Sequence, residues 1–343
     1  MIRSKSFITL ALAAALVLAG CGKGINGPGD GGNDGNVGWI RQNSVTANDL
    51  LAVSFSDTSN GWAVGWFTIL HTTDGGRTWS PQTQNAARQG ALFTGVSSPD
   101  SSHCWVVGAD GSIQATSDAG RTWRLQDTGL AGSSLYGVAF SDTTNGWACG
   151  RRSGAAGAAI RYTQNGGGIW VNGDATGIQE LRAISVSKPY SFRVVACGLL
   201  GTVATSVNGG VSWIRSPSTG TTQMLQGVAM LPGNGLSVLA GGVPGIGGIL
   251  RTFDGGDTWQ PSQSLPAGVQ VNGLDMASFN VGWMVGTSSA HSEVARTSDG
   301  GLSWLSQFVN WGLPLNGVCA VNSNYAWAVG DQGAIFFTRT GGN

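Results

Sequence analysis

TTDGGRTW, residues 72–79, is an octapeptide that returns five times along the chain. The later copies are TSDAGRTW (116–123), TQNGGGIW (163–170), SVNGGVSW (206–213), TFDGGDTW (252–259) and TSDGGLSW (297–304). Successive final tryptophans are 44, 47, 43, 46 and 45 residues apart. A constant period of this length indicates a fold built from repeated units that pack on their neighbours.

Each octapeptide closes a longer unit that has room for four short strands, here named A to D in chain order. In the first unit they are LLAVSF (50–55), WAVG (62–65), TILHT (68–72) and the segment TWSPQ (78–82) after the turn. Asn60-Gly61 before strand B is a typical hairpin pair. Four strands in about 45 residues is the pattern of a β-propeller blade.

The last unit needs a strand from elsewhere. LNGVCA (315–320), YAWAVG (325–330) and AIFFT (334–338) supply its strands A to C, and the chain ends at Asn343. Trp39-Ile40-Arg41-Gln42 repeats the Trp-x-x-Gln pattern of residues 79–82. We therefore expect an all-β, seven-bladed propeller over residues 39–343, whose last blade is closed by the N-terminal strand 39–42.

The polar residue of each octapeptide is interpreted as structural. A carboxylate or amide oxygen there can accept backbone N–H groups of its own turn, the next glycine permits a positive φ, and the tryptophan covers the turn. These positions are Asp74, Asp118, Asn165, Asn208, Asp254, Asp299 and, in the last unit, Thr340.

The first 38 residues contain signals that predict where the protein is located. Arg3 and Lys5 precede an apolar run that is too short to span a bilayer as a permanent helix. Leu18-Ala19-Gly20-Cys21 resembles the bacterial lipobox, so residues 1–20 are expected to be a lipoprotein signal peptide and Cys21 to carry the lipid. An ordinary signal peptide or a short N-terminal anchor remain alternatives. Gly-rich residues 21–38 then form a tether.

From these signals we expect the folded part to lie outside the cytoplasm, attached by lipid to a bacterial membrane. Gly22 follows Cys21 where an inner-membrane retention signal has Asp, which favours the outer membrane. Removal of residues 1–20 leaves 16 basic against 18 acidic side chains, a net charge of −2, so no nucleic-acid partner is expected. A monomer is expected.

The unit GVxF…NGWAVG…GxIxxTxDGGxTW resembles the Asp-box (BNR) repeat superfamily. Within it, the NGWAVG strand before the box is similar to photosystem II assembly and stability factors, which are often lipoproteins. The resemblance covers residues 39–343 and implies a scaffold that binds a protein of a membrane complex. Those factors are Arg-rich on one face, whereas the 15 arginines of this chain are spread out.

Binding is expected on one face of the ring. A–B loops and C–D turns share the lower face, so the B–C and D–A loops form the upper face, where propellers usually bind. Twelve of the 14 tryptophans are in register with the repeat and belong to the core. Trp66 and Trp311 are not, and both lie in upper-face loops. We interpret them as an aromatic patch for a protein or a glycan, against the alternative that each covers local backbone.

Further candidates lie in upper-face loops or break the repeat. Arg151 and Arg152 are in the B–C loop of blade 3, His291 and Glu293 in that of blade 6, and Arg182 begins strand A of blade 4. Asp275 stands where the other blades carry small neutral residues. It is a candidate upper-face or channel-facing group, or else a structural carboxylate with donors.

No cofactor or metal is expected from the spacing of the cysteines and histidines. Cys104, Cys149, Cys197 and Cys319 are interpreted as small buried hydrophobes. A sialidase-like carbohydrate hydrolase is the alternative function, which needs paired carboxylates or a tyrosine nucleophile with arginines. The chain has only two glutamates and four tyrosines. A binding scaffold without catalysis is therefore favoured.

Overall fold

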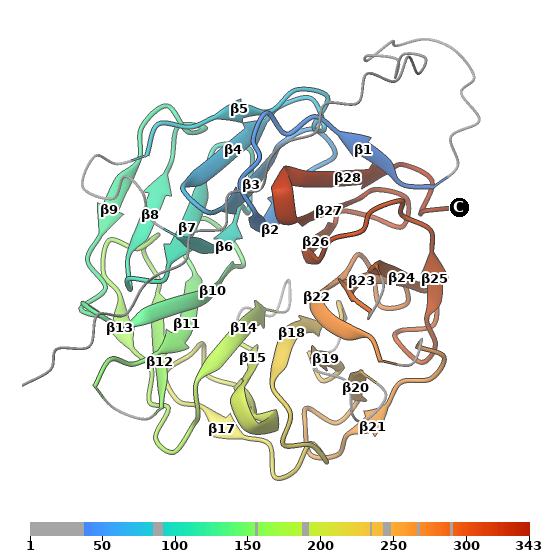
Figure 1. Cartoon of the computed structure of the whole chain (residues 1–343). Helices are drawn as coiled ribbons and strands as arrows, with labels where there is room; N and C mark the ends of the chain where they lie inside the picture. The colour runs from blue at the N-terminus through green and yellow to red at the C-terminus, as the bar shows by residue number, and fades with distance from the viewer. Residues whose placement is uncertain are drawn as a thin grey trace, which may run out of the picture. The chain divides into compact units, whose positions relative to one another are not determined.

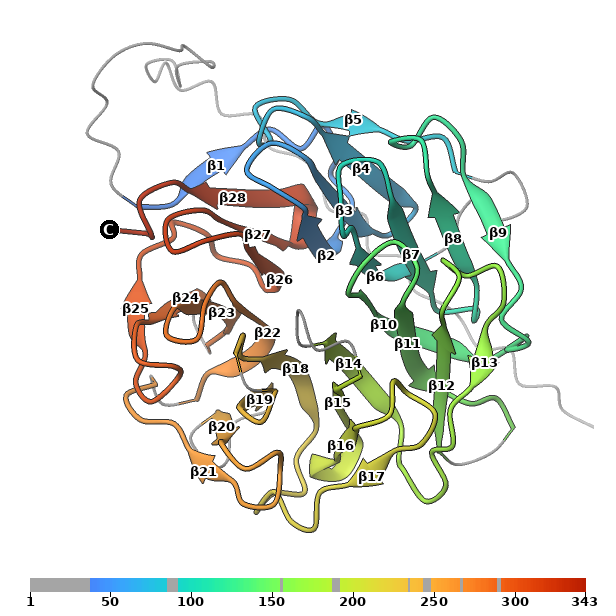
Figure 2. The same ribbon diagram turned by 180° about the vertical axis from the view of Figure 1, so that it is seen from behind.

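The computed structural model describes residues 38–84, 92–154, 157–186, 192–233, 235–242, 248–265, 268–288 and 291–343. These residues form seven four-stranded antiparallel sheets, arranged as blades around a central axis (Figure 1, and from behind in Figure 2). The expected seven-bladed propeller is confirmed. The predicted signal peptide, Cys21 and nearly all of the predicted tether lie outside the described residues.

Blades 1 to 4 each use four consecutive strands. Their bounds are β2 (Leu50–Phe55), β3 (Gly61–Gly65), β4 (Thr68–Thr72), β5 (Ser80–Pro81); β6 (Phe93–Ser97), β7 (Cys104–Gly108), β8 (Ile113–Thr116), β9 (Arg124–Gln126); β10 (Ser134–Phe140), β11 (Gly146–Arg151), β12 (Ala158–Thr163), β13 (Val171–Asn172); β14 (Leu181–Val186), β15 (Val194–Gly198), β16 (Val203–Ser206) and β17 (Ile214–Arg215).

Blades 5 and 6 follow the same order, and blade 7 takes its outer strand from the N-terminus. The bounds are β18 (Leu225–Met230), β19 (Val238–Gly242), β20 (Ile249–Thr252), β21 (Gln260–Pro261); β22 (Gln270–Met276), β23 (Gly282–Thr287), β24 (Ser292–Thr297), β25 (Leu305–Gln307); β26 (Leu315–Ala320), β27 (Ala326–Gly330), β28 (Ala334–Thr338) and β1 (Ile40–Gln42).

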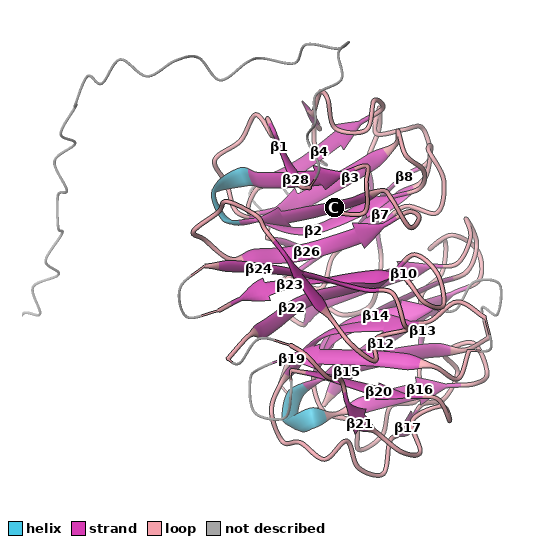
Figure 3. Cartoon of the chain, turned by 90° about the vertical axis from the view of Figure 1, so that its right-hand side faces the viewer, coloured by secondary structure: helices cyan, strands magenta, loops and turns pink. Residues whose placement is uncertain are grey.

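Closure of the ring between the two ends of the chain is confirmed. Strand β1 pairs with β28 in antiparallel register, Ile40 opposite Phe337 and Gln42 opposite Ile335. Figure 1 shows β1 in blue beside β28 in red. The two short 3-10 turns, Leu199–Gly201 and Asp331–Gly333, are B–C loops, and Figure 3 shows both on one side of the ring. That side is the upper face.

The core lies between the blades. Seven clusters of buried side chains occur in the described residues, one for each seam between neighbouring blades. At the seam of blades 7 and 1, the rings of Phe55 and Trp327 stack 3.7 Å apart. Trp105 and Phe140 repeat this contact between blades 2 and 3, also at 3.7 Å. Strand B is buried in every blade except at the last residue of β11 and β23, because it has a blade on either side.

In blades 2, 6 and 7 the glutamine of the Trp-x-x-Gln pattern in strand D bonds to the next blade. Gln42 of blade 7 donates to the Gly75 carbonyl oxygen at 2.8 Å and accepts the Trp79 indole N–H at 3.3 Å, both in blade 1. Gln126 does the same for Gly166 and Trp170 between blades 2 and 3. The pattern therefore forms a side-chain latch across the seam.

The octapeptide turns are held by their polar residue. Asp74 Oδ1 accepts the Thr72 hydroxyl at 2.8 Å and the Thr78 backbone N–H at 2.9 Å. Its second oxygen accepts the Thr78 hydroxyl at 2.7 Å. Asn165 keeps two of these three bonds, from Thr163 and the Ile169 N–H. Asp118, Asp254 and Asp299 bond in the same way as Asp74. Asn208 Oδ1 accepts the Ser206 hydroxyl and the Ser212 N–H, while its Nδ2 donates to the Ser212 hydroxyl at 2.8 Å.

In blade 7, Thr340 stands at the octapeptide position that holds Asp or Asn in the other blades. The Thr340 hydroxyl donates to the Asn343 carbonyl oxygen at 3.0 Å, and the Thr338 hydroxyl accepts the Gly342 N–H at 2.8 Å. The bond from Gly342 repeats the one between Gly76 and Thr72 in blade 1. The turn is therefore kept with fewer side-chain bonds.

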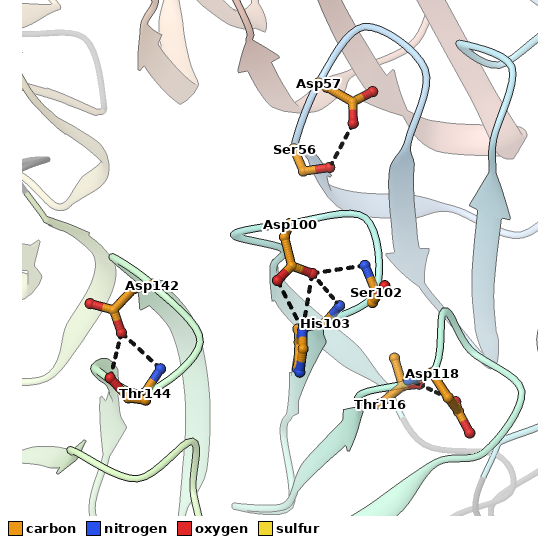
Figure 4. Close-up of polar contacts among 9 residues, drawn as sticks. All are labelled: Ser56, Asp57, Asp100, Ser102, His103, Thr116, Asp118, Asp142 and Thr144. Atoms are coloured by element: carbon orange, nitrogen blue, oxygen red, sulfur yellow. Dashed lines mark hydrogen bonds and ion pairs between the residues drawn. The ribbon is translucent and has the colours of Figure 1, made fainter.

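A second set of carboxylate turns lies in the A–B loops of the lower face. Asp142 Oδ1 accepts the Thr144 N–H at 2.7 Å and the Asn145 N–H at 2.8 Å, and Asp57 and Asp100 make equivalent bonds. Figure 4 shows these three carboxylates turned to their own loops. The Asn-Gly pairs predict only a hairpin here, although Ser-Asp-Thr at 56–58 and 141–143 is the signal for these carboxylate turns.

Candidate functional site

The upper mouth of the central channel is lined by one residue from strand A of each blade. Strand A is irregular at the same place in every blade, where one residue is skipped in the pairing with strand B. Such a bulge leaves the extra residue unpaired and turns its side chain out of the sheet. The seven residues line a cavity of about 200 Å³: Leu51, Thr94, Tyr136, Arg182, Gln226, Asn272 and Asn316.

Arg182 is the charged member of this ring. Its guanidinium carbon lies 4.2 Å from the centre of the Tyr136 ring of blade 3, and its Nη2 is 2.5 Å from Glu180 Oε1. The Glu180 side chain is only 11% exposed, and Arg151 Nε lies 3.9 Å from its other oxygen. Glu180 therefore holds two arginines of different blades on the upper face.

Arg152 and Arg161 form the other half of this cluster. Both donate to Asn172 Oδ1, at 3.3 and 2.6 Å, and Arg161 Nε also donates to the Thr128 carbonyl oxygen at 2.7 Å. Burial, and then the charge of Arg152, lower the pKa of Arg161. Two adjoining hollows of about 220 and 420 Å³ share Arg152 and Asn172 in their walls.

The Arg cluster is thus Arg151, Arg152, Arg161 and Arg182, with Glu180 beside Arg151 and Arg182 and Asp174 in the wall of one hollow with Arg152. Arg151, Arg152 and Arg182 are candidates from the sequence, whereas Arg161 is not among them. A signal for Arg161 exists, because at that strand-C position five of the other six blades carry an apolar residue, such as Leu70 or Ala295. A cluster of this kind can bind carboxylate or phosphate groups by paired hydrogen bonds.

Trp66 and Trp311 lie in upper-face loops, but on different seams. Trp66 is 43% exposed beside Phe67, which is 53% exposed, with ring centres 5.7 Å apart. Trp311 is only partly exposed and packs on blade 7, with the Arg41 guanidinium 4.3 Å from its ring centre and Phe336 at 6.0 Å. No contact joins the two tryptophans in the described structure.

Asp275 lies towards the lower end of strand A and bonds across a seam. Its carboxylate accepts the Ala320 N–H of blade 7 at 2.8 Å, and also its neighbour Met276 N–H at 2.9 Å. Ser97 and Ser185 accept the corresponding N–H groups of the next blades. The structure therefore gives Asp275 a blade-joining role instead of a place on the upper face.

The remaining candidates for chemistry are few. Cys104, Cys149, Cys197 and Cys319 are buried, and burial raises the pKa of the Cys149 thiol to about 12. In the described part of the chain no three His, Cys, Asp or Glu side chains are grouped to hold a metal ion. His291 and Glu293 line a separate pocket on blade 6. None of the described helices has the length and apolar character needed to cross a membrane.

Comparison with known proteins bears out the family resemblance. A family model described as photosynthesis system II assembly factor YCF48 matches residues 33–125. A photosystem II assembly lipoprotein Ycf48 from Synechococcus sp. (strain CC9902) is 25% identical over 313 residues, covering 87% of each chain. The chain therefore resembles the photosystem II assembly factors over almost the whole propeller.

Solved structures show the same fold. YCF48 bound to a D1 peptide superposes with a TM-score of 0.69 and 22% identity, covering 88% of this chain and 97% of that one. YCF48 from Cyanidioschyzon merolae gives 0.70 and 18%, covering 88% and 99%. A GH74 xyloglucanase from Xanthomonas campestris gives 0.68 and 12%, covering 89% of this chain and 54% of the enzyme.

Proposed function

We propose that this chain is an extracytoplasmic scaffold of the photosystem II assembly-factor kind, which binds a segment of a membrane-complex protein while that complex is assembled. Resemblance to a named assembly lipoprotein over 87% of the chain supports this proposal. The related YCF48 binds a D1 peptide, and the partner here is a polypeptide segment of the same general type.

The Arg cluster carries the proposal. Arg151 and Arg152 are exposed. Glu180 pairs with Arg151 and Arg182, and Asp174 lines one hollow with Arg152, so two carboxylates compensate only part of the charge of the four arginines. Charge concentrated beside two hollows favours an acidic segment or a chain-terminal carboxylate, since guanidinium groups bind carboxylates through two parallel bonds. We assign the binding surface to the upper face of blades 3 and 4.

We propose that the protein is attached to a bacterial membrane by lipid on Cys21, with the outer membrane favoured. The Synechococcus relative is itself a lipoprotein by name. We propose that the chain works as a monomer, and closure of the ring by its own N-terminal strand supports this, since blade 7 needs no strand from a second copy. Cys21→Ser should move the protein from the membrane fraction to the soluble fraction, and a membrane-bound Cys21→Ser variant would overturn the lipid anchor.

No catalysis is proposed. The two glutamates lie on blades 4 and 6, and Glu180 is held between Arg151 and Arg182. The carboxylates of the octapeptides are occupied by their own turns. The likeness to the xyloglucanase, at 12% identity, extends to the fold alone.

The test is affinity capture from detergent-solubilised membranes, with captured proteins identified by mass spectrometry. The wild-type chain should retain a subunit of a membrane complex, and Arg151→Ala/Arg152→Ala should reduce its recovery at least tenfold. Arg77→Ala/Arg121→Ala is the matched control, because these exposed arginines lie in lower-face turns. Equal loss in both double variants, or no loss in either, would contradict the assignment.

A further inference from the structure

A pocket of about 510 Å³ opens at the outer edge of blade 6, away from the Arg cluster. Its walls are the start of β24, with His291 and Glu293, and residues 306–312 at the end of β25 and in the loop that follows. The strand β25 is the outermost strand of its sheet, as Figure 1 shows. Its outer backbone edge is thus open to an extended polypeptide.

Glu293 brings a poorly compensated charge into this pocket. Its side chain is only 7% exposed, and His291 Nε2 lies 3.8 Å from its Oε2. The Ser306 hydroxyl donates to Oε1 at 2.6 Å. No lysine or arginine pairs with Glu293 in the described structure, whereas Glu180 has two arginines. A buried carboxylate in this state favours the arrival of a cation.

Apolar side chains surround the charge. Phe308 is 84% exposed and lines the pocket together with Val309 and Trp311. The Trp311 ring already has the Arg41 guanidinium 4.3 Å from its centre, so these walls are compatible with a cation. Aromatic rings beside a carboxylate select an ammonium or guanidinium group on an apolar stem.

We propose that this pocket binds a lysine or arginine side chain of a partner polypeptide that lies along the outer edge of β25, with Glu293 as the counter-charge. A polypeptide fits better than a free amine. It can also cover Phe308, which projects into solvent beside the pocket, and bond to the open strand edge. The proposal does not rest on the proposed function, because the Arg cluster lies on other blades and selects the opposite charge.

The test uses the full chain in detergent and a fluorescent peptide with the sequence Gly-Val-Lys-Val-Gly, followed by anisotropy. The peptide should bind the wild-type chain, and its norleucine counterpart should bind at least tenfold more weakly. Glu293→Gln, which keeps the side-chain shape, should raise the Kd of the lysine peptide at least tenfold. Equal binding of the norleucine peptide, or an unchanged Kd in Glu293→Gln, would overturn the proposal.

A second pair of variants tests the pocket independently in case Glu293→Gln does not fold. Phe308→Ala should also weaken peptide binding at least tenfold without changing the melting temperature, since Phe308 is 84% exposed. Phe279→Ala is the control, because Phe279 is 41% exposed in a lower-face loop. An unchanged Kd in Phe308→Ala would count against the pocket.

Two further arms identify the source of the cation and the site. n-Butylammonium should displace the labelled peptide only at concentrations far above those of the unlabelled peptide. Displacement at equal concentration would overturn the polypeptide occupant in favour of a free amine. Arg151→Ala/Arg152→Ala should bind the lysine peptide like wild type, and a loss there would move the binding away from blade 6.

Discussion

At the scale of single residues, the octapeptide turns show which part of an aspartate the fold uses. One oxygen of Asp118 accepts the Thr116 hydroxyl and the Thr122 N–H, at 2.8 and 2.9 Å, and the other accepts the Thr122 hydroxyl at 2.7 Å. The first oxygen is enough for the turn, because Asn165 has only that set of bonds. An aspartate carboxyl, unlike an asparagine amide, also titrates, so it makes the stability of the fold depend on pH.

Asp118→Asn should reduce the loss of stability in acid. The Thr122 side chain, then its N–H and the Thr116 hydroxyl lower the pKa of Asp118 to about 2, from a usual 3.8. A carboxyl whose folded pKa is lowered contributes stability above pH 4 that is lost as the pH falls towards 2. The fall in melting temperature between pH 4.5 and 2.5 should therefore be smaller in Asp118→Asn. An identical fall would contradict this account.

His71 should give a separate pH dependence between pH 7 and 5. It stacks on Trp62 at 3.8 Å, and burial lowers its pKa below 6.5. The unfolded chain then takes up a proton that the folded chain refuses, so stability is complete above pH 6.5 and falls below it, by at most about 1.4 kcal/mol for each pH unit.

His71→Phe keeps the aromatic contact and should flatten the melting-temperature profile between pH 7 and 5. Phe337 of blade 7 stands at the equivalent position, so the repeat accepts this residue. Tyr162→Phe, also at the equivalent position, is the control and should leave the profile as in wild type. If His71→Phe kept the wild-type slope, another group would be responsible.

At the scale of elements, the latch glutamines explain how the short D strands hold neighbouring blades together. Gln307 of blade 6 accepts the indole N–H groups of Trp39 and Trp283 and donates to the Gly341 carbonyl oxygen. In blades 3, 4 and 5 the glutamine is replaced by Gly173, Ser216 and Ser262. The indole N–H groups of Trp213 and Trp259, in the blades after Gly173 and Ser216, bond within their own turns. The latches are thus concentrated around the closing blade.

Gln42→Ala should lower the free energy of unfolding by about 1–2 kcal/mol, because two part-buried hydrogen bonds across the seam of blades 7 and 1 are lost. The midpoint of urea unfolding measures this change. Gln223→Ala removes an exposed side chain and should leave the midpoint unchanged. A Gln42→Ala midpoint equal to that of wild type would mean that the latch adds nothing.

The repeat made these elements predictable, and its breaks were harder to interpret. Strand 39–42 was predicted to close blade 7 because Trp39 and Gln42 have the spacing of Trp79 and Gln82. Contacts between blades have no such pattern. The bond between Asp275 and Ala320, and the stacking of Arg182 on Tyr136, depend on which residue of strand A in the neighbouring blade lies beside each side chain. The sequence could identify these residues as exceptions to the repeat, but it could not identify their partners.

At the scale of the whole molecule, a ring built from both ends of the chain should depend on its N-terminal strand. A chain that begins at Asn43 lacks β1 and leaves β28 as an unpaired edge. It also loses the contacts of Trp39, Arg41 and Gln42 with blades 6 and 1.

We expect this truncation to cost at least about 3 kcal/mol and to lower the melting temperature by several degrees. A chain that begins at Gly38 keeps every described contact and is the control. Calorimetry of the two chains under the same conditions measures the difference. Equal melting temperatures would show that blade 7 holds without its fourth strand.

The position of the closing strand β1 predicts how the propeller responds to a mechanical force. Strands D run from the lower to the upper face, so the chain before residue 38 leaves the ring at the lower end of β1, whose three residues pair with β28. Any tension applied to that leading segment reaches this strand, with its few contacts to blades 6 and 1, before it reaches the rest of the ring. A pulling experiment from the N-terminus should therefore detach residues 38–42 as the first rupture event, and the ring should open there before any blade unfolds.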